Sequence, residues 1–574
     1  MVFKLRSFTI FVVLLFMISI VSGCGSPNVT NPQTTAATTQ AQIESTTDAT
    51  TAAAVTTIAS QTSMEATIEA GALYKYDPPI AATFGKPLDV NSDGIVAMEK
   101  DGEPYDNNRW IKYFRDDVGV ECSYKLIAPN SMEYDQKLLL GMSSDDLPDI
   151  FWVSSLSMLK QLADAGAIVD MTDYYDQYAN ETFRGVIEFE GLEIFNPVTF
   201  NNRRYAIPVK MPSTNGYNHC WVRQDWLDEL GLERPKTMDD VKDITRAFKE
   251  HYPDNIGMMI NMEYISESKG IFWAFGGQTA VRKYWTTLDD GTVVFSEIQP
   301  EMKGGLAWLR DMYAEGLVNQ EFATQDIAKA FEYVADNKCG IFFAPHWYGF
   351  RLHGAEQSLD PEADFVAVGL PVGSVQTTRV YATNTFDAVE CVRAGYEHPE
   401  ALIHLYNAYE EKLFGPNNDF DNYFSSEFNT GTWSCGPIHA LHPMVDLIPH
   451  RDIKAALANN TLDELTGAGK SFWKYITTGQ RAYDYMFGPV DSCFNFVDDT
   501  YPDIIVWNGY MGAPTETWAD RWSSLQELID TTFLKIIQGN LDLDSGFDNM
   551  VKEWNALGGE QVTKEVNEIV ATYK

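Results

Sequence analysis

Residues 147–166, LPDIFWVSSLSMLKQLADAG, pass from a buried strand into an amphipathic helix. The run at 149–153 follows a proline and has the length and apolar character of a strand covered on both faces. Leucines then recur at helical spacing until Gly166 ends the helix. A buried strand that leads directly into a helix is typical of an α/β layer with parallel strands.

The same alternation extends in both directions from this stretch. Upstream, residues 110–118 and 134–142 have helical spacing, and a short strand at 124–127 lies between them. Residues 205–209 form a connecting strand, after which the alternation resumes. Further strands are predicted at 256–260, 340–344 and 365–368, and further helices at 225–230, 237–248, 301–313, 399–406 and 525–537. The sequence therefore predicts two α/β regions without an internal repeat.

The N-terminus has the pattern of an export signal. Lys4 and Arg6 precede an apolar run from Phe8 to Val21, which is too short for a comfortable membrane span. The run ends at Val-Ser-Gly-Cys24, which resembles a bacterial lipobox, whose cysteine is lipidated and becomes the mature N-terminus. We expect residues 1–23 to be removed and Cys24 to anchor the protein on the outer face of the cell membrane; the alternative is an ordinary signal peptide.

Residues 24–72 are predicted to be a disordered linker. From Gly25 to Ala72 the chain has no aromatic residue and no Lys or Arg, and it is rich in Thr and Ala. Such a composition cannot bury enough apolar surface to offset the entropy of ordering the backbone. Order should begin near Leu73, so this segment would act as a tether between anchor and folded head.

The charge of the chain excludes several classes of partner. With 42 Lys+Arg against 81 Asp+Glu, the formal net charge is −39, whereas nucleic-acid binding needs a basic face. Attraction to an anionic lipid surface is equally disfavoured. Besides Cys24 there are six cysteines, whose spacings fit no zinc motif; we expect buried free thiols, and one or two disulfides stay open as an alternative.

From about residue 80 to the C-terminus the sequence resembles the extracellular solute-binding lipoproteins of carbohydrate-type ABC importers. The resemblance rests on the order and spacing of several short strings. They are LPDIF at 147–151, YAIP at 205–208, WVRQDWL at 221–227, PKTM at 235–238, GAPT at 512–515 and the closing helices from 531 to 559.

This resemblance implies a two-lobed α/β fold with a ligand cleft between the lobes and a central sheet in each lobe. Lobe 1 would comprise residues 73–208 and about 373–450, and lobe 2 residues 209–372 and about 451–574. It further implies a monomer that captures a sugar or oligosaccharide by lobe closure and delivers it to membrane permease subunits, with no catalysis, cofactor or metal.

The resemblance also nominates residues that contact the ligand. Sugars present an apolar face on which aromatic rings stack and a rim of hydroxyl groups that polar groups bind. The segment at 148–155 is similar to a sugar-contacting segment of maltose-binding proteins, which nominates Trp152 and Ser155. Glu263 and Tyr264 follow the predicted strand at 256–260 and resemble a second ligand-contacting stretch of the family, so they are nominated as well. Trp347, with its neighbour Tyr348, follows the strand at 340–344 and is the best single stacking candidate.

Four further candidates rest on the residues alone. Tyr217, Trp273, Trp433 and Trp507 lie beside loop signals, where rings can be presented to a ligand. Taken singly, each is more often a core residue. Arg223 and Asp225 are expected to brace the hinge.

Other functions remain open at this stage. The sequence has no HExxH or GxSxG motif, but a lipoprotein glycoside hydrolase is an alternative because 81 acidic residues guarantee chance carboxylate pairs. A sensor partner with a non-sugar ligand, such as a peptide or a polyamine, is another. Residues 89–94, DVNSDG, match the start of an EF-hand loop, but position twelve is Lys100, so a turn is expected.

Overall fold

The computed structural model describes residues 73–262, 269–352, 362–375, 379–382, 386–416, 418–424 and 431–573. The predicted signal peptide, Cys24, the linker and the candidates Glu263 and Tyr264 lie outside these residues. The described residues belong to one compact unit.

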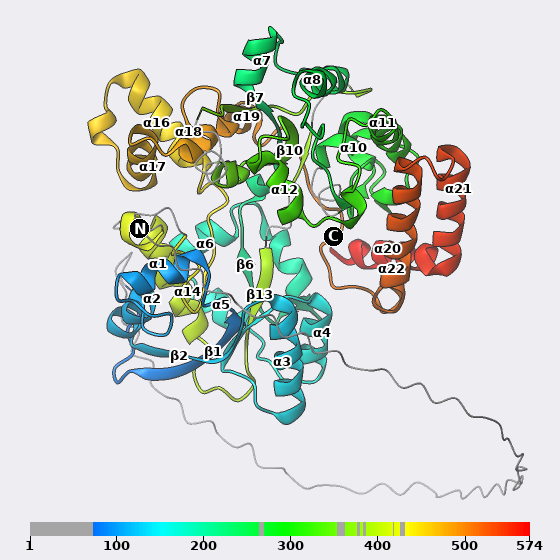
Figure 1. Cartoon of the computed structure of the whole chain (residues 1–574). Coiled ribbons are helices and arrows are strands. Elements are labelled where there is room, and N and C mark those ends of the chain that lie inside the picture. Colours follow the sequence, from blue (N-terminus) through cyan, green and yellow to red (C-terminus); the bar gives the residue numbers. More distant parts are fainter. Residues whose placement is uncertain are drawn as a thin grey trace, which may run out of the picture. The chain divides into compact units, whose positions relative to one another are not determined.

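A five-stranded sheet organises the first α/β region (Figure 1). In spatial order its strands are β2 (Val120–Ala128), β1 (Ile80–Pro87), β3 (Ile150–Val153), β13 (Phe386–Val392) and β6 (Ile207–Lys210). β1 is parallel to β2 and β3, as the sequence predicts, whereas β13 runs antiparallel to β3 and β6. The helices of this region are α1 (Asp93–Lys100), α2 (Arg109–Tyr113), α3 (Ser131–Ser144), α4 (Leu156–Asp164), α5 (Thr172–Tyr178), α6 (Glu181–Ile187), α14 (Ala401–Phe414) and α15 (Phe420–Tyr423).

The second region is built on a three-stranded sheet that is antiparallel throughout. Its order is β10 (Ile341–Pro345), β7 (Asn218–Arg223) and β11 (Phe365–Val368). Its helices are α7 (Gln224–Leu230), α8 (Met238–His251), α10 (Lys269–Gly276), α11 (Met302–Ala314) and α12 (Ile327–Ala335). Local signals set the start of α8, where Thr237 and Asp240 form the predicted capping box.

One predicted strand is absent. Residues 256–260 form only an isolated bridge, between Met258 and Val318. Gly257 lies there at φ 88°, and a Cβ at that position would meet the Leu317 carbonyl oxygen at 2.2 Å. This close approach of two backbones interrupts the regular strand that the apolar sequence favours.

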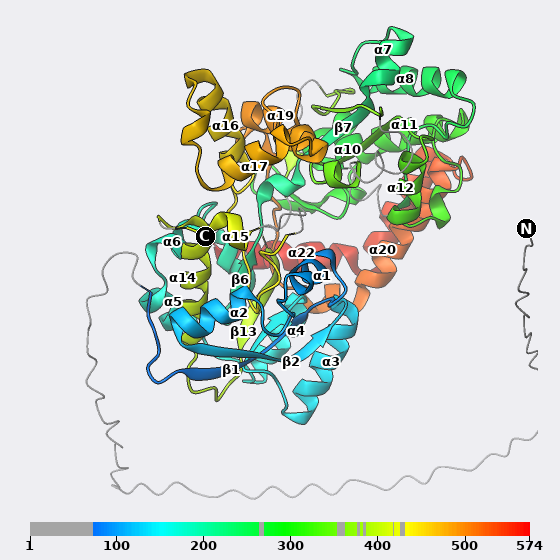
Figure 2. The ribbon, with the colours of Figure 1, turned by 60° about the vertical axis from the view of Figure 1, so that its left-hand side comes forward.

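Helices dominate the C-terminal third of the chain, and α16 packs beside α17 (Figure 2). They are α16 (Leu447–Asn459), α17 (Gly467–Thr477), α18 (Arg481–Phe487), α19 (Cys493–Thr500), α20 (Glu516–Ile537), α21 (Leu543–Trp554) and α22 (Glu560–Val570). Short strand pairs complete the fold: β4 (Thr199–Phe200) with β5 (Arg203–Arg204), β8 (Trp285–Thr287) with β9 (Val293–Phe295), and β12 (Val380–Tyr381) with β14 (Ile505–Val506). Within the described ranges, no helix has the length and apolar character that crossing a bilayer requires.

Two large hydrophobic clusters form the core. One contains buried side chains from residues 76–209 and 388–440, and the other contains side chains from 217–380 and 420–566. All six cysteines after residue 72 are buried and unpaired, as expected for free thiols. Residues 89–92 form a turn that leads into α1. The proposed lobe boundaries stay a prediction; Val380, Phe420 and Leu441, which they assign to lobe 1, lie in the cluster at 217–380 and 420–566.

Candidate functional site

A cavity of about 420 Å³ brings two of the predicted stacking residues together. We call it the Trp347–Trp433 pocket. Its buried apolar side chains belong to the cluster at 217–380 and 420–566, and Phe424 packs against both clusters. Met211, Pro212 and Asn215 come from the connection between β6 and β7. The lining residues are Gly94, Met211, Pro212, Asn215, His346, Trp347, Phe350, Phe424, Gly431, Trp433, Leu441, Val445, Asp446, Phe472, Tyr483 and Phe487. A volume of this size is typical of small-ligand sites.

Trp347 reaches the pocket because a buried strand ends just before it. β10 runs to Pro345, and His346 and Trp347 form the turn that follows. The Trp347 ring is partly exposed and packs against Tyr348, with ring centroids 4.3 Å apart. Tyr348 itself is fully buried and also contacts Phe331. A ring that is packed on one side and open on the other is suited to stacking on a ligand.

Trp433 lies on a loop whose carbonyl groups are held by buried side chains. The Trp110 indole donates to the Thr432 carbonyl at 3.0 Å, and the Tyr409 hydroxyl donates to the Trp433 carbonyl at 3.0 Å. The Asn108 amide donates to the Cys435 carbonyl at 2.9 Å. Because these donors come from the core of the first region, the loop is fixed before any ligand arrives, which lowers the entropy cost of binding.

Lys86 on β1 extends this support. Its buried ammonium contacts the Ser434 carbonyl at 3.1 Å, the Gly436 carbonyl at 2.9 Å and His439 Nδ1 at 3.1 Å. Burial lowers the pKa of Lys86, and it raises the pKa of the neighbouring carboxyl of Glu390 on β13. The three hydrogen-bond contacts of the Lys86 ammonium in the described chain all go to the segment that carries Trp433.

His439 connects Trp433 to a third candidate, Trp152. The His439 ring lies 5.2 Å from the Trp433 ring and 5.0 Å from the Trp152 ring. Trp152 is the third residue of β3 and is 9% exposed. It contacts His439, which in turn contacts Trp433, so Trp152 supports the pocket indirectly. Burial holds the pKa of His439 well below its usual range, and the nearby Lys86 charge lowers it further.

The polar part of the lining is small and contains one carboxylate. Asp446 Oδ2 lies 3.5 Å from His346 Nε2, and the two side chains are 15% and 4% exposed. Asn215 and Tyr483 add an amide and a hydroxyl. The phenyl rings of Phe472 and Phe487, whose centroids are 4.5 Å apart, form an apolar part of the lining. The aromatic rings can stack on the apolar face of a ligand such as a sugar, and the polar groups can bind its hydroxyl groups.

A second ring-lined cavity, of about 240 Å³, lies at the start of α20; we call it the Trp285 pocket. The Trp285 and Trp518 rings are 5.5 Å apart, and Trp518 and Trp522 are 4.7 Å apart. Ser154 and Lys283 supply polar groups to its lining. The Trp285 indole nitrogen is buried and has no hydrogen-bond partner among the described residues.

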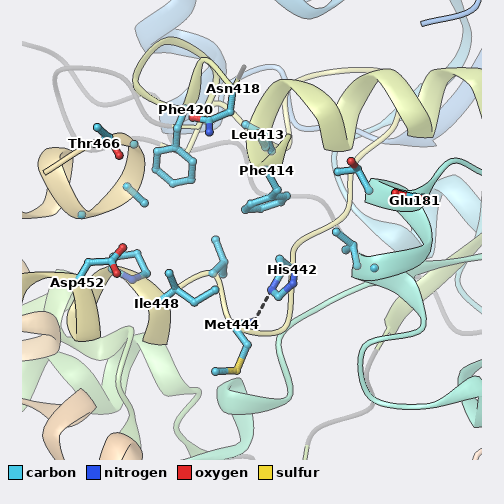
Figure 3. A pocket seen from close by; sticks show the side chains of 18 residues that line it. Glu181, Leu413, Phe414, Asn418, Phe420, His442, Met444, Ile448, Asp452 and Thr466 are labelled. Atoms are coloured by element: carbon cyan, nitrogen blue, oxygen red, sulfur yellow. Dashed lines mark hydrogen bonds between the residues drawn. The ribbon is translucent and has the colours of Figure 1, made fainter. Parts of the chain in front are cut away.

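A third cavity, of about 450 Å³, opens between α6, α14, α16 and the start of α17 (Figure 3). Phe414 and Phe420 face Ile448 across it, and His442 accepts a hydrogen bond at Nδ1 from the Met444 backbone amide at 3.0 Å. Burial lowers the pKa of His442 to about 4. None of the predicted ligand-binding residues lies in its lining.

The remaining candidates lie elsewhere. Ser155 is the N-cap of α4, where its hydroxyl accepts from the Met158 amide at 3.3 Å. Tyr217 is fully buried in a hydrophobic cluster, and Trp273 is buried against Tyr381. Trp507 is 40% exposed and precedes Asn508, which lines the Trp285 pocket.

The hinge candidates form a local ion pair. Arg223 at the end of β7 binds Asp225 at 2.5 Å and the Asn337 side chain at 2.6 Å, and its guanidinium lies over the Trp226 ring. These contacts join β7, α7 and the end of α12, so the pair braces the second region.

Several pocket residues were missed by the sequence reasoning. Asp446 and Tyr483 have no distinguishing local pattern and are far from Trp347 in sequence. Asp446 directly precedes α16, and Tyr483 lies in α18. His346, in contrast, directly precedes Trp347 and could have been included. Trp518 and Trp522 are four residues apart on a helix capped by Thr515, a spacing that predicts a shared ring face.

Comparison with known proteins places these features in a family context. Residues 110–382 match the family model described as bacterial extracellular solute-binding protein. The chain is 21% identical over 491 residues to the lipoprotein LipO of Bacillus subtilis (strain 168), covering 82% of this chain and 90% of LipO. It is also 21% identical over 453 residues to the polygalacturonan/rhamnogalacturonan-binding protein YtcQ of the same organism, covering 77% and 84% of the two chains.

A third relative is similar in both sequence and structure. The fructooligosaccharide ABC transporter substrate-binding protein FusA of Streptococcus pneumoniae serotype 4 (strain ATCC BAA-334 / TIGR4) is 27% identical over 245 residues, which is 40% of this chain and 45% of FusA. An EF-hand mutant of FusA in complex with fructo-nystose superimposes with a TM-score of 0.59 at 18% identity, covering 86% of this chain and 99% of that structure.

Proposed function

We propose that this chain, which belongs to the bacterial extracellular solute-binding proteins, captures a sugar or oligosaccharide in the Trp347–Trp433 pocket for an ABC importer. Its fold is the two-lobed α/β fold of that family. The observation that carries the proposal is the convergence of Trp347 and Trp433, from distant parts of the sequence, on one cavity with a small polar set.

The mechanism is binding without chemistry. The rings stack on the apolar face of the sugar, while Asn215, Asp446 and Tyr483 bind hydroxyl groups. Because Phe424 of the lining packs against both hydrophobic clusters, and buried side chains of the first region hold the Trp433 loop, ligand contacts stabilise one arrangement of the two lobes. That arrangement is the one that a permease would recognise. The lobes are proposed to comprise residues 73–208 with about 373–450, and 209–372 with about 451–574.

A glycoside hydrolase is the less favoured reading of the same cavity. Hydrolysis of a glycosidic bond needs two carboxyl groups about 5–10 Å apart. Among the described residues of the lining, Asp446 is the one acidic side chain. We therefore expect the ligand to leave unaltered, which mass spectrometry of the sugar after prolonged incubation would check.

The site of action is proposed to be the outer face of the cell membrane. The lipobox-like string before Cys24 supports a lipid anchor, the Thr- and Ala-rich segment supports a tether, and the relative LipO is named a lipoprotein. Since an acyl anchor would then be the sole attachment, replacing Cys24 by Ala should release the exported protein into the medium. Retention of the variant on membranes would contradict the anchor.

A thermal-shift screen of the purified protein against a panel of oligosaccharides tests the proposal. A ligand that binds only the folded state raises the melting temperature by mass action, by RT ln(1 + [L]/Kd) in free energy. We expect at least one oligosaccharide to raise it. A rise with peptides or polyamines and with no sugar would contradict the carbohydrate assignment.

A further inference from the structure

We infer that the Trp347–Trp433 pocket selects uncharged oligosaccharides and rejects those built from uronic acids, an inference that rests on the proposed function. Two relatives carry names that represent the two ligand classes. YtcQ is named a polygalacturonan/rhamnogalacturonan-binding protein, whose ligand contains uronic acid, and FusA is named a fructooligosaccharide transporter substrate-binding protein, whose ligand is uncharged. The charges around the pocket distinguish the two ligand classes.

The lining carries a negative charge and no positive one to match a uronate. Asp446 is its one carboxylate among the described residues, and its neighbour is the His346 ring at 3.5 Å. The described lining contains no Lys or Arg. A bound uronate would lose water from its carboxylate and meet Asp446 without a cationic partner, and such like-charge contacts disfavour binding.

Two described cations contact residues of the lining or its support but do not line the cavity. Lys86 is 3% exposed and its ammonium is shared by two carbonyl groups and His439. Arg351 lies over the rings of Tyr348 at 5.3 Å and Trp347 at 5.8 Å. The described lining therefore lacks the bidentate Arg or free Lys groups that bind carboxylates in a uronate site.

Pairs of oligosaccharides that differ only at C6, such as cello-oligosaccharides and cellouronates or mannan and mannuronan fragments of equal length, test the inference by calorimetry. We expect the neutral member of every binding pair to bind at least tenfold more tightly. Equal affinity, or a preference for the uronate, overturns the inference while leaving sugar capture intact. Failure of all sugars to bind overturns the proposed function itself, and the inference with it.

Two variants assign the selectivity to the pocket. Asp446→Asn should narrow the neutral-to-uronate ratio by at least tenfold, whereas the matched control Asp452→Asn, in the cavity beside α16, should leave the ratio unchanged. An unchanged ratio in Asp446→Asn overturns the role of Asp446. Uronate binding that Lys283→Gln abolishes would place the sugar site in the Trp285 pocket, and it would overturn the choice of the Trp347–Trp433 pocket on which the inference rests.

Discussion

The rings of Trp433 and His439 meet edge to face with their centroids 5.2 Å apart, so the imidazole supports the indole from the protein side. His439 is in turn held by Lys86 and contacts Trp152. The ring that lines the pocket therefore has a rigid support, and a ligand that stacks on Trp433 finds it already in position.

Trp433→Ala should weaken binding of the best oligosaccharide at least tenfold, about 1.4 kcal/mol, because the stacking surface is lost. Calorimetric titration measures the change. Trp473→Ala, which removes a partly buried indole of α17 outside the pocket lining, is the matched control and should leave the affinity unchanged. Equal affinities in wild type and Trp433→Ala would remove Trp433 from the site.

Lys86→Met should lower both stability and affinity. The methionine fills the space of the side chain but leaves the Ser434 and Gly436 carbonyl groups without their donor, at about 1–3 kcal/mol for an unsatisfied buried group. Urea unfolding measures the stability loss. Lys125→Met, which removes a partly exposed ammonium from β2, should cost much less.

A double-mutant cycle separates positioning from general stability. If Lys86 acts on the ligand through Trp433, the affinity losses of Lys86→Met and Trp433→Ala should not add. Additive losses would assign Lys86 a structural role alone.

Features that depend on neighbouring residues were predicted correctly from the sequence, whereas features that depend on long-range contacts were not. The strand and helix around Trp152, and the cap at Thr237, depend on neighbouring residues and were predicted. The prediction of a strand at 256–260 was wrong because the close approach of Gly257 to Leu317, which interrupts it, is a long-range contact. Trp347 was nominated by the resemblance to solute-binding proteins and Trp433 as a ring beside a loop signal. Asp446 was not predicted, since only the folded chain brings it to His346.

His219 on β7 should make the protein less stable in acid. Burial, with a smaller contribution from His346, lowers the pKa of His219 to about 3. The unfolded chain binds the proton near pH 6.5, so the unfolded state carries more protons below that value, and stability present at neutral pH is lost as the pH falls from 6.5 toward 3. At pH 5 the loss from this residue is about 2 kcal/mol.

Comparing urea unfolding of wild type and His219→Leu at pH 7.5 and 5 isolates this contribution. The variant should lose less stability on acidification, by about 2 kcal/mol. His251→Leu, at an exposed position, should keep the wild-type pH dependence. A variant whose stability falls as steeply as that of wild type would contradict the prediction.

The six buried thiols should be inert in the folded protein. Burial raises the pKa of Cys339 and of Cys435 to about 11, so little thiolate forms at neutral pH. An Ellman titration should find none of the six described thiols reactive in buffer and all six reactive in denaturant. Fewer than six in denaturant would indicate a disulfide, contrary to the structure.

A crystal structure of the protein with its tightest-binding neutral oligosaccharide is the decisive measurement for the proposed site. We expect an intact sugar in the Trp347–Trp433 pocket, with a ring face against Trp433 and a hydroxyl group on Asp446. A sugar seated in the Trp285 pocket with the Trp347–Trp433 pocket empty, or a cleaved product in either, would contradict it.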